Sequence, residues 1–390
     1  MEDETQQNIQ PVQEQDSGQR AAPIRIEKYF RAMIKAGASD LHLKSGAPVY
    51  FRSKTVLRPA KGERFTERDL EQMALELLNP KQRAALEEGG SIDVAYEIEG
   101  SDRFRINIYR QRGTLAIAVR RVTKQIRDVD SLHLPPILNK IAEENQGLVL
   151  LSGPTGCGKS TTIAAMMEHI NKTRPCHIVT IEDPIEYLYE DKLALINQRE
   201  IGIDVETFES ALKYLMREDP DVVLIGEMRD RETFQAALQA SETGHLVFGT
   251  VHASSAPQTI GRILDLMPPD SRDLIRGSLA FNLRAIICQK LLPCVKEGID
   301  RVPAAEILLI DPSARQLIME SREAELSDLI RAHERDGMLS FTRSLFELIE
   351  KDFVDPRVAY EMAPNVEELK MMMKGISSSQ AGLMTRRHGQ

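Results

Sequence analysis

The sequence predicts an α/β protein in which a small α+β domain precedes a parallel sheet with helices on both faces. Two observations predict this arrangement. A chain of 390 residues is too long for one ordinary domain. After residue 137, short apolar runs of strand length alternate with helical stretches, which is typical of a parallel sheet.

The composition, 42% hydrophobic and 28% charged, is that of a globular protein. The formal net charge is -9, whereas proteins that grip nucleic-acid backbones usually carry a basic surplus, so no nucleic acid is expected as a partner. No apolar run approaches the ~20 residues that cross a bilayer. The polar start has no signal-peptide core, so we expect a cytoplasmic protein. The four cysteines include no CxxC pair, which disfavours a zinc site or a disulfide framework.

The first third of the chain changes character twice. Residues 1–23 are polar and lack periodicity, which predicts a disordered tail, either a mere solvated leader or a tether. Residues 24–124 read as the small α+β domain. Its predicted helices cover 25–36 and 67–78, and its predicted strands cover 41–43, 92–98, 103–111 and 114–122. The charged segment 125–136 ends in two prolines and is expected to be a linker.

Residues 137–375 are expected to form the larger domain. A short helix at 137–144 opens it. The predicted parallel strands are 148–151, 177–181, 222–225 and 246–251. Beyond Pro268 and Pro269 the pattern is mainly helical, with one more strand candidate at 305–310. The Ser- and Gly-containing end, 376–390, is expected to be flexible.

A phosphate-binding motif follows the first of these strands. The segment fits G-x-x-x-x-G-K-[ST] and opens a helix, and its residues are Gly153, Pro154, Thr155, Gly156, Cys157, Gly158, Lys159, Ser160 and Thr161. Glycines let backbone N–H groups wrap phosphates at a helix N-terminus. Lys159 would reach the β- and γ-phosphates of ATP, and the Ser160 hydroxyl would bind Mg²⁺. The alternative, an ordinary Gly-rich turn, fits the strand–loop–helix context poorly.

Acidic residues end two further strands. Glu227 follows the apolar run 221–225 and is predicted to orient the attacking water. Gly226 stands where an aspartate often precedes that glutamate, so the acid that serves the metal must come from elsewhere. Glu182 and Asp183 are predicted to polarise Mg²⁺ or its waters. Helix-capping or surface carboxylates are the alternative.

Two histidines flank the strand at 246–251. His252 lies at its carboxyl end, where α/β sheets place ligands, and is predicted to sense the γ-phosphate. His245 lies before the strand and is a second catalytic candidate, with a hydrogen-bonded packing histidine as the alternative.

The small domain carries a run of arginines that includes Arg105, Arg112 and Arg121. Such a run is usually a solvated face. Brought across a subunit interface, arginines neutralise a γ-phosphate, an effect worth ~10³–10⁵ in rate.

Together these motifs resemble the secretion-type traffic ATPases, and among them the PilT/PilU-type pilus-retraction ATPases. The segments 38–43, 104–107, 111–113, 180–186, 226–230 and 243–252 carry the resemblance, which spans about residues 24–374. It implies a PAS-like small domain joined to a RecA-like P-loop NTPase core in a hexameric ring. It also implies that Arg105, Arg112 and Arg121 reach the neighbouring subunit's ATP. Hydrolysis would turn a platform protein in the inner membrane, placing the motor peripherally at the pilus base.

The resemblance leaves the branch of the family open. Relatives that assemble pili or secrete proteins resemble this core but carry a tetracysteine zinc motif, whereas the only cysteines near that position here are Cys288 and Cys294. The segment 312–320 only partly matches the principal retraction motors, and 280–286 leans slightly towards an accessory, PilU-like paralogue. The motifs would also fit a weakly hydrolysing nucleotide-binding regulator or a nucleic-acid translocase, the latter disfavoured by the net charge.

Overall fold

The computed structural model describes residues 24–375 apart from 54, 55, 63, 99 and 123. The predicted tails 1–23 and 376–390 lie outside the described residues. Contacts within the chain divide it into two units, with the boundary between Arg121 and Val122. Each unit has its own sheet and its own core, and each is described by itself.

The first unit is a six-stranded sheet with the order β3-β2-β1-β6-β5-β4. Its strands are β1 (Asp40–Lys44), β2 (Tyr50–Ser53), β3 (Val56–Pro59), β4 (Ser91–Glu97), β5 (Arg103–Gln111) and β6 (Thr114–Val122). The pairs β1–β2, β2–β3, β1–β6 and β4–β5 are antiparallel. The sequence predicted β5 and β6 with their observed bounds, but it missed β2 and β3.

Three helices cover this sheet: α1 (Glu27–Lys35), α2 (Glu67–Leu77) and α3 (Pro80–Gly89). Alternate side chains of β5 point into the core, so that Phe104, Ile106 and Ile108 are buried. Phe30 of α1 stacks on Phe104 with ring centroids 4.4 Å apart. The caps of α2 and α3 are local, because Thr66 and Asn79 each accept from a backbone N–H three residues ahead.

The second unit is built on a seven-stranded sheet with the order β13-β12-β7-β11-β10-β8-β9. Its strands are β7 (Gly147–Ser152), β8 (His177–Glu182), β9 (Leu195–Glu200), β10 (Val222–Ile225), β11 (Leu246–Val251), β12 (Leu283–Pro293) and β13 (Arg301–Leu309). All neighbouring pairs are parallel except β12–β13, which is antiparallel. The sheet is therefore mixed rather than parallel throughout. Neither β9 nor β12 was predicted.

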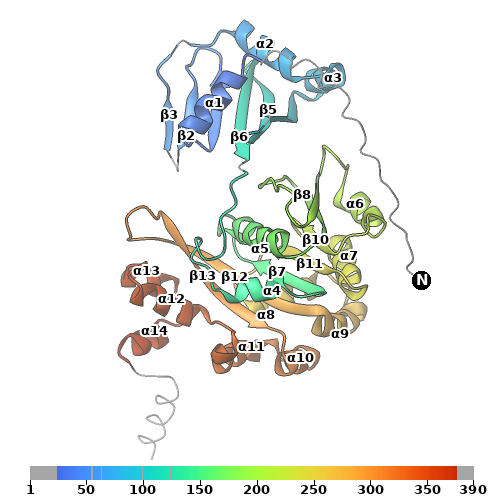
Figure 1. Ribbon diagram of the computed structural model, residues 1–390, viewed down its shortest axis with the longest axis vertical. Helices are drawn as coiled ribbons and strands as arrows, with labels where there is room; N and C mark the ends of the chain where they lie inside the picture. The colour runs from blue at the N-terminus through green and yellow to red at the C-terminus, as the bar shows by residue number, and fades with distance from the viewer. Residues whose placement is uncertain (1–23, 54–55, 63, 99, 123, 376–390) are drawn as a thin grey trace, which may run out of the picture. The chain divides into compact units, whose positions relative to one another are not determined.

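Helices pack on both faces of this sheet (Figure 1). The first of them along the chain are α4 (Ile137–Ala142), α5 (Lys159–Thr173), α6 (Phe208–Leu215), α7 (Arg231–Glu242), α8 (Ala256–Asp265) and α9 (Arg272–Asn282). Consecutive residues of β7 belong to different cores. Leu148 packs in the core that includes α7 and α8, whereas Val149 packs in the core that includes α4 and α5.

The remaining helices, orange to red in Figure 1, complete the core that contains α7 and α8. They are α10 (Pro312–Met319), α11 (Leu326–Ala332), α12 (Phe341–Glu350), α13 (Pro356–Met362) and α14 (Val366–Met373), with short 3-10 turns at Pro269–Ser271, Glu323–Glu325 and Glu334–Asp336. In the segment expected to be a linker, Val129, Leu132 and Leu134 are buried in the core that includes α4 and α5. Apolar residues in this segment thus help to build the second unit.

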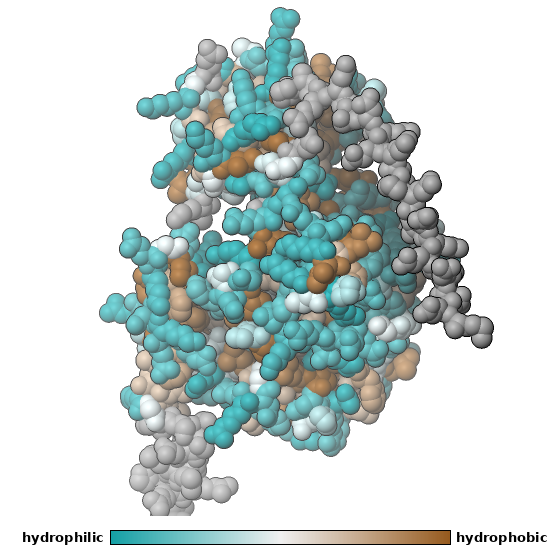
Figure 2. Space-filling view, in the orientation of Figure 1, coloured by the Kyte–Doolittle hydropathy of each residue, from teal (hydrophilic) through white to brown (hydrophobic). Residues whose placement is uncertain are grey.

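Among the described helices, none is both long and apolar enough to cross a membrane. The face drawn in Figure 2 is mostly hydrophilic, with small apolar areas scattered between charged and polar side chains.

Candidate functional site

The predicted phosphate-binding loop lies between the carboxyl end of β7 and the start of α5. Gly158 is the residue that precedes the helix, and its φ of 96° is in the left-handed region that favours glycine. The helix therefore begins directly at Lys159, and the unpaired N–H groups of its first turn face the loop. This local geometry is that of an anion-binding site.

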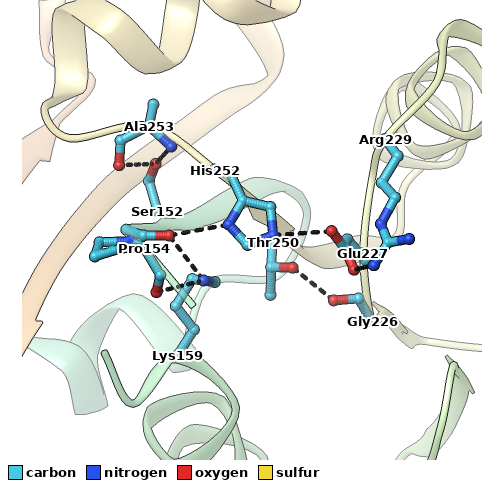
Figure 3. Close-up of polar contacts among 10 residues, drawn as sticks. Ser152, Pro154, Lys159, Gly226, Glu227, Arg229, Thr250, His252 and Ala253 are labelled. Atoms are coloured by element: carbon cyan, nitrogen blue, oxygen red, sulfur yellow. Dashed lines mark hydrogen bonds and ion pairs between the residues drawn. The ribbon is translucent and has the colours of Figure 1, made fainter. Parts of the chain in front are cut away.

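Lys159 is buried at the base of the loop. Its Nζ donates to the carbonyl of Gly153 at 2.8 Å and to that of Pro154 at 3.2 Å (Figure 3). The ammonium group is thus held by neutral carbonyl oxygens. It keeps its full charge available for an anionic ligand.

Glu227 follows β10 and faces the same loop. Its carboxylate accepts hydrogen bonds from Arg229 and from His252 Nε2, the latter at 2.9 Å (Figure 3). The hydrogen bond from Arg229 is the main cause that lowers the pKa of Glu227, against the opposing effect of burial. The carboxylate therefore stays ionised at neutral pH, as a group that orients water must.

His252 connects the acid to the loop. Its Nδ1 lies 3.3 Å from the carbonyl oxygen of Gly153 while its Nε2 contacts Glu227. Both contacts are to oxygens that only accept, so both are hydrogen bonds at once only when both ring nitrogens carry protons. The ring therefore lies between the loop and the acid, within reach of both.

Hydrogen bonds from two side-chain hydroxyls to backbone groups connect the ends of three strands. Ser152 Oγ at the end of β7 donates to the carbonyl of Ala253 and accepts from its N–H, each at 3.0 Å. Thr250 Oγ1 in β11 donates to the carbonyl of Gly226 at 2.6 Å. Because β7, β11 and β10 are neighbours in the sheet, these bonds fix Glu227 and His252 relative to the phosphate-binding loop.

The acids after β8 differ from each other. Glu182 is 8% exposed, and its Oε1 accepts from Thr180 Oγ1 at 2.7 Å and from Gln198 Nε2 at 3.2 Å. Burial is the main cause that raises its pKa to about 7. Asp183, the next residue, is exposed. The pair therefore supplies one buried carboxyl that titrates near neutrality and one solvated carboxylate.

Lys159, Glu182, Glu227 and His252 line one cavity of about 540 Å³. Four neighbouring strands, β7, β11, β10 and β8, send their carboxyl ends to it, as expected for ligands in an α/β sheet. Of the predicted site residues it gathers Thr155, Gly156, Gly158, Lys159, Ser160, Thr161, Glu182, Asp183, Glu227 and His252. Gly153, Pro154 and Cys157 lie in the same loop and line an adjoining cavity.

The donor set fits Mg²⁺. The Ser160 hydroxyl and the carboxyl groups of Glu182 and Asp183 are hard oxygen ligands at one cavity. Within the described part of the chain, no three His, Cys, Asp or Glu side chains are grouped so as to hold a metal by themselves. Mg²⁺ takes few protein ligands and shares phosphate oxygens and water, so this set suits it better than a metal that needs a full protein cage.

A second cavity, of about 350 Å³, adjoins the other side of the loop. Gly158 and Thr161 line it, together with Leu134 from the segment before α4 and Leu291 from β12. Its wall combines apolar side chains with Arg127 and other polar groups. It is large enough for a flat heterocycle next to the phosphate-binding loop.

Some predicted residues are not brought to the cavity. His245 precedes β11, at the opposite end of the strand from His252, and its Nδ1 lies 2.9 Å from the carbonyl of Ala240. Arg105, Arg112 and Arg121 belong to the first unit, on β5, in the turn after it and on β6. Arg121 forms an ion pair with Asp102 of the same unit.

Sequence reasoning missed several residues of the site. Arg229 directly contacts Glu227, and its position two residues later in a loop gave a weak signal. Tyr187 lines the cavity and its hydroxyl lies 2.8 Å from Thr161 Oγ1. Gln289 was missed because its strand, β12, was not predicted. The apolar run 285–288, rich in isoleucine and bounded by Pro293, is the signal that identifies such a buried strand.

Comparison with known proteins identifies the family of the chain. The family described as Type II/IV secretion system protein matches residues 15–345. The type IV pilus retraction ATPase PilT of Pseudomonas aeruginosa is 39% identical over 338 residues, 87% of this chain and 98% of the relative. The type IV pilus ATPase PilU of the same organism is 35% identical over 358 residues, 92% of this chain and 94% of the relative.

A crystal structure of the pilus retraction motor PilT with bound ADP is also similar. It is 40% identical, with a TM-score of 0.82, and covers 89% of this chain and 99% of that chain. These matches confirm the resemblance on which the sequence analysis rested. On the extent of the family match and of these alignments, the chain belongs to the type II/IV secretion system protein family, on the branch that contains the pilus-retraction ATPases.

Proposed function

We propose that this chain is an ATPase that hydrolyses ATP to drive the retraction of type IV pili. The single observation that carries the proposal is the cavity at which Lys159, Glu227 and His252 meet. Phosphoryl transfer to water needs a cation at the phosphates and a residue that orients the water, and Lys159 and Glu227 suit these roles. His252 contacts that carboxylate. Two relatives that match over nearly their whole length are a pilus-retraction ATPase and a pilus ATPase.

In this proposal the loop from Gly153 to Thr161 binds the phosphates of ATP. Lys159 exchanges its contacts with loop carbonyls for the β- and γ-phosphates. Ser160 would hold Mg²⁺, with Glu182 and Asp183 acting on the ion or on its waters, and the bound ion would supply positive charge at the phosphates. The adenine ring of ATP lies in the second cavity, beside Thr161 and Leu291.

Glu227 orients the attacking water and takes up its proton. His252 holds the carboxylate in place through Nε2 and lies on the side of the cavity that receives the γ-phosphate. When that phosphate leaves, the contact from His252 to the loop changes, so the histidine reports the state of the nucleotide to β11.

The remaining parts of the proposal concern assembly. The first unit is a PAS-like domain spanning residues 24–124, and the second is a RecA-like core at 137–375 joined to it through 125–136. Six chains form a ring in which Arg105, Arg112 and Arg121 act on a neighbour's nucleotide. The ring works on an inner-membrane platform protein from the cytoplasmic side, either as the principal motor or as an accessory PilU-like paralogue.

Two other functions are less well supported. A pilus-assembly or secretion ATPase of the zinc-containing kind would need four clustered cysteines, whereas Cys288 is fully buried within the sheet. A regulator that binds ATP but scarcely hydrolyses it would not need an ionised Glu227 held at the cavity by two partners.

The experiment that tests the proposal is the ATPase rate per subunit measured across protein concentrations, with Glu227→Gln as the control. A rate that rises as rings form, and that disappears in the control, supports an ATPase whose site is completed between subunits. A rate near zero at every concentration would contradict the motor function. It would favour a nucleotide-binding regulator, or a subunit that needs a partner motor.

A further inference from the structure

Gln289 lies behind the phosphate-binding loop. It belongs to β12, which runs parallel to β7, and Cys288 pairs with Ser152 at the last registered position before the loop. The side chain of Gln289 is only 3% exposed. A buried amide must find partners for both its N–H₂ and its carbonyl oxygen.

Both partners of this amide belong to the nucleotide-binding segment. Gln289 Nε2 donates to the carbonyl oxygen of Cys157 at 2.9 Å, and Gln289 Oε1 accepts from Thr162 Oγ1 at 2.7 Å. Thr162 lies in the first turn of α5 and is 1% exposed. One side chain therefore bonds to the loop and to the helix that follows it.

The bond to Cys157 has a consequence for the next residue. A peptide group is planar, and its C=O and N–H point in opposite directions. When Gln289 holds the carbonyl of Cys157 on the side of β12, the N–H of Gly158 is turned to the opposite side. Gly158 lines the cavity that contains Lys159 and Ser160, so that N–H is directed towards a bound anion.

The loop also fits closely against this residue. A Cβ added at Gly153 would come within 2.6 Å of the backbone oxygen of Gln289, and one added at Gly158 within 2.8 Å of its Nε2. Two glycines of the motif are thus required by the approach of Gln289 as well as by their backbone angles. The close approach of Gln289 is therefore part of how the loop packs against β12.

We propose that Gln289 is a positioning residue that holds the phosphate-binding loop in its anion-binding conformation by fixing the peptide between Cys157 and Gly158. The inference rests on the proposed function, because it names a determinant of nucleotide binding at that same site. Gln289 does not touch the reacting atoms. Its effect is to present a backbone N–H and the first turn of α5 in the right orientation.

The test compares Gln289→Leu with wild type in the full-length chain. Leucine keeps the volume but leaves the buried Cys157 carbonyl and the Thr162 hydroxyl without the amide, so the loop loses the bonds that fix its peptide and should leave the anion-binding conformation. The Kd values for ATP and for tripolyphosphate should rise by the same factor, since the phosphate loop is what changes. In turnover, KM should rise about tenfold while kcat changes by less than about threefold, because the lost binding is common to ground and transition states.

Ile287→Val is the matched control, a conservative change at a fully buried position two residues earlier on the same face of β12. It should lower the Tm without changing either Kd. If Gln289→Leu does not fold, Gln289→Asn carries the test, because the shorter side chain keeps an amide but withdraws it from Cys157.

A folded Gln289 variant that binds ATP and tripolyphosphate within twofold of wild type would overturn the proposal. So would a loss of kcat with unchanged affinity, which would make the residue part of the chemistry instead. These outcomes are separate from failure of the proposed function, since in that case the wild-type chain itself would neither bind nor hydrolyse ATP.

Discussion

His252 Nε2 lies 2.9 Å from Glu227 Oε1, so the carboxylate of one strand end is held by the imidazole of the next. The same ring reaches the carbonyl of Gly153 through Nδ1. A displacement of the phosphate-binding loop is therefore passed through one rigid ring to the acid. Glu227 and the loop are thus connected through one side chain.

Replacing Glu227 by glutamine should leave ATP binding almost unchanged and should lower kcat by about 10²–10⁴-fold, because the amide keeps the shape but accepts no proton. Equilibrium binding of ATP and steady-state hydrolysis measured on the same preparation check this. A variant with wild-type turnover would remove Glu227 from the role of base.

Replacing His252 by asparagine should lower kcat by at least about tenfold, because the shorter side chain loses both the contact to Glu227 and the reach to the γ-phosphate side. ADP affinity should change less, since the histidine acts on the γ-phosphate side. His169→Asn is the matched control, as His169 also contacts a carboxylate, that of Glu143 at 2.9 Å, but on the exposed part of α5. Equal losses in the two variants would argue against a specific role of His252.

Arg112→Ala should lose turnover without losing nucleotide affinity if the arginine acts on a neighbour's γ-phosphate. Mixing it with Lys159→Ala, which retains its arginines but does not bind ATP, should then restore part of the rate. Arg105→Ala is tested in the same way. The ATPase rate of Lys159→Ala alone is the baseline. A mixture of the two variants whose rate stays at that baseline would contradict action between subunits.

The stability of the second unit should depend on pH through Glu182. Burial raises the pKa of this carboxyl from 4.5 to about 7 in the folded chain. Between those values the folded state binds more protons than the unfolded state, so the stabilisation present below pH 4.5 is lost as the pH rises through 7. Relative to Glu182→Gln, the wild-type free energy of unfolding should fall by roughly 3 kcal/mol over this window.

Urea unfolding followed by circular dichroism at pH 5, 6, 7 and 8 measures this difference. EDTA should be present and nucleotide left out, so that no cation stabilises the ionised form. Parallel pH profiles of the wild type and Glu182→Gln would show that the carboxyl is ionised throughout.

Much of the site was predictable because it depends on local patterns. The loop from Gly153 to Thr161 follows a spacing that only one kind of turn satisfies, and the apolar run before Glu227 identified a buried strand end. Parallel strands place their carboxyl ends at one edge of a sheet, so Glu227 and His252 could each be expected at that edge, whereas their direct contact is seen only in the structure.

The residues that were missed depend on pairing between distant segments. Nothing near Gln289 in the sequence indicates that its strand lies beside β7, and the sheet order alone brings it to Cys157. His245 does not line the cavity, although its place in the sequence suggested that it would. It shares a motif with His252, but a strand of six residues separates the two side chains along the sheet.

The two faces of β12 serve different neighbours. Gln289 faces the phosphate-binding loop, whereas the ammonium of Lys290 donates to the carbonyl of Met362 at 3.1 Å and lies 4.5 Å from the ring centroid of Phe341. Deleting a single residue within this strand would exchange its faces, turning the lysine to the loop and the amide to the last helices. Over evolutionary time, natural variation in length should therefore be confined to the 294–300 connection, and β12 should keep a constant number of residues.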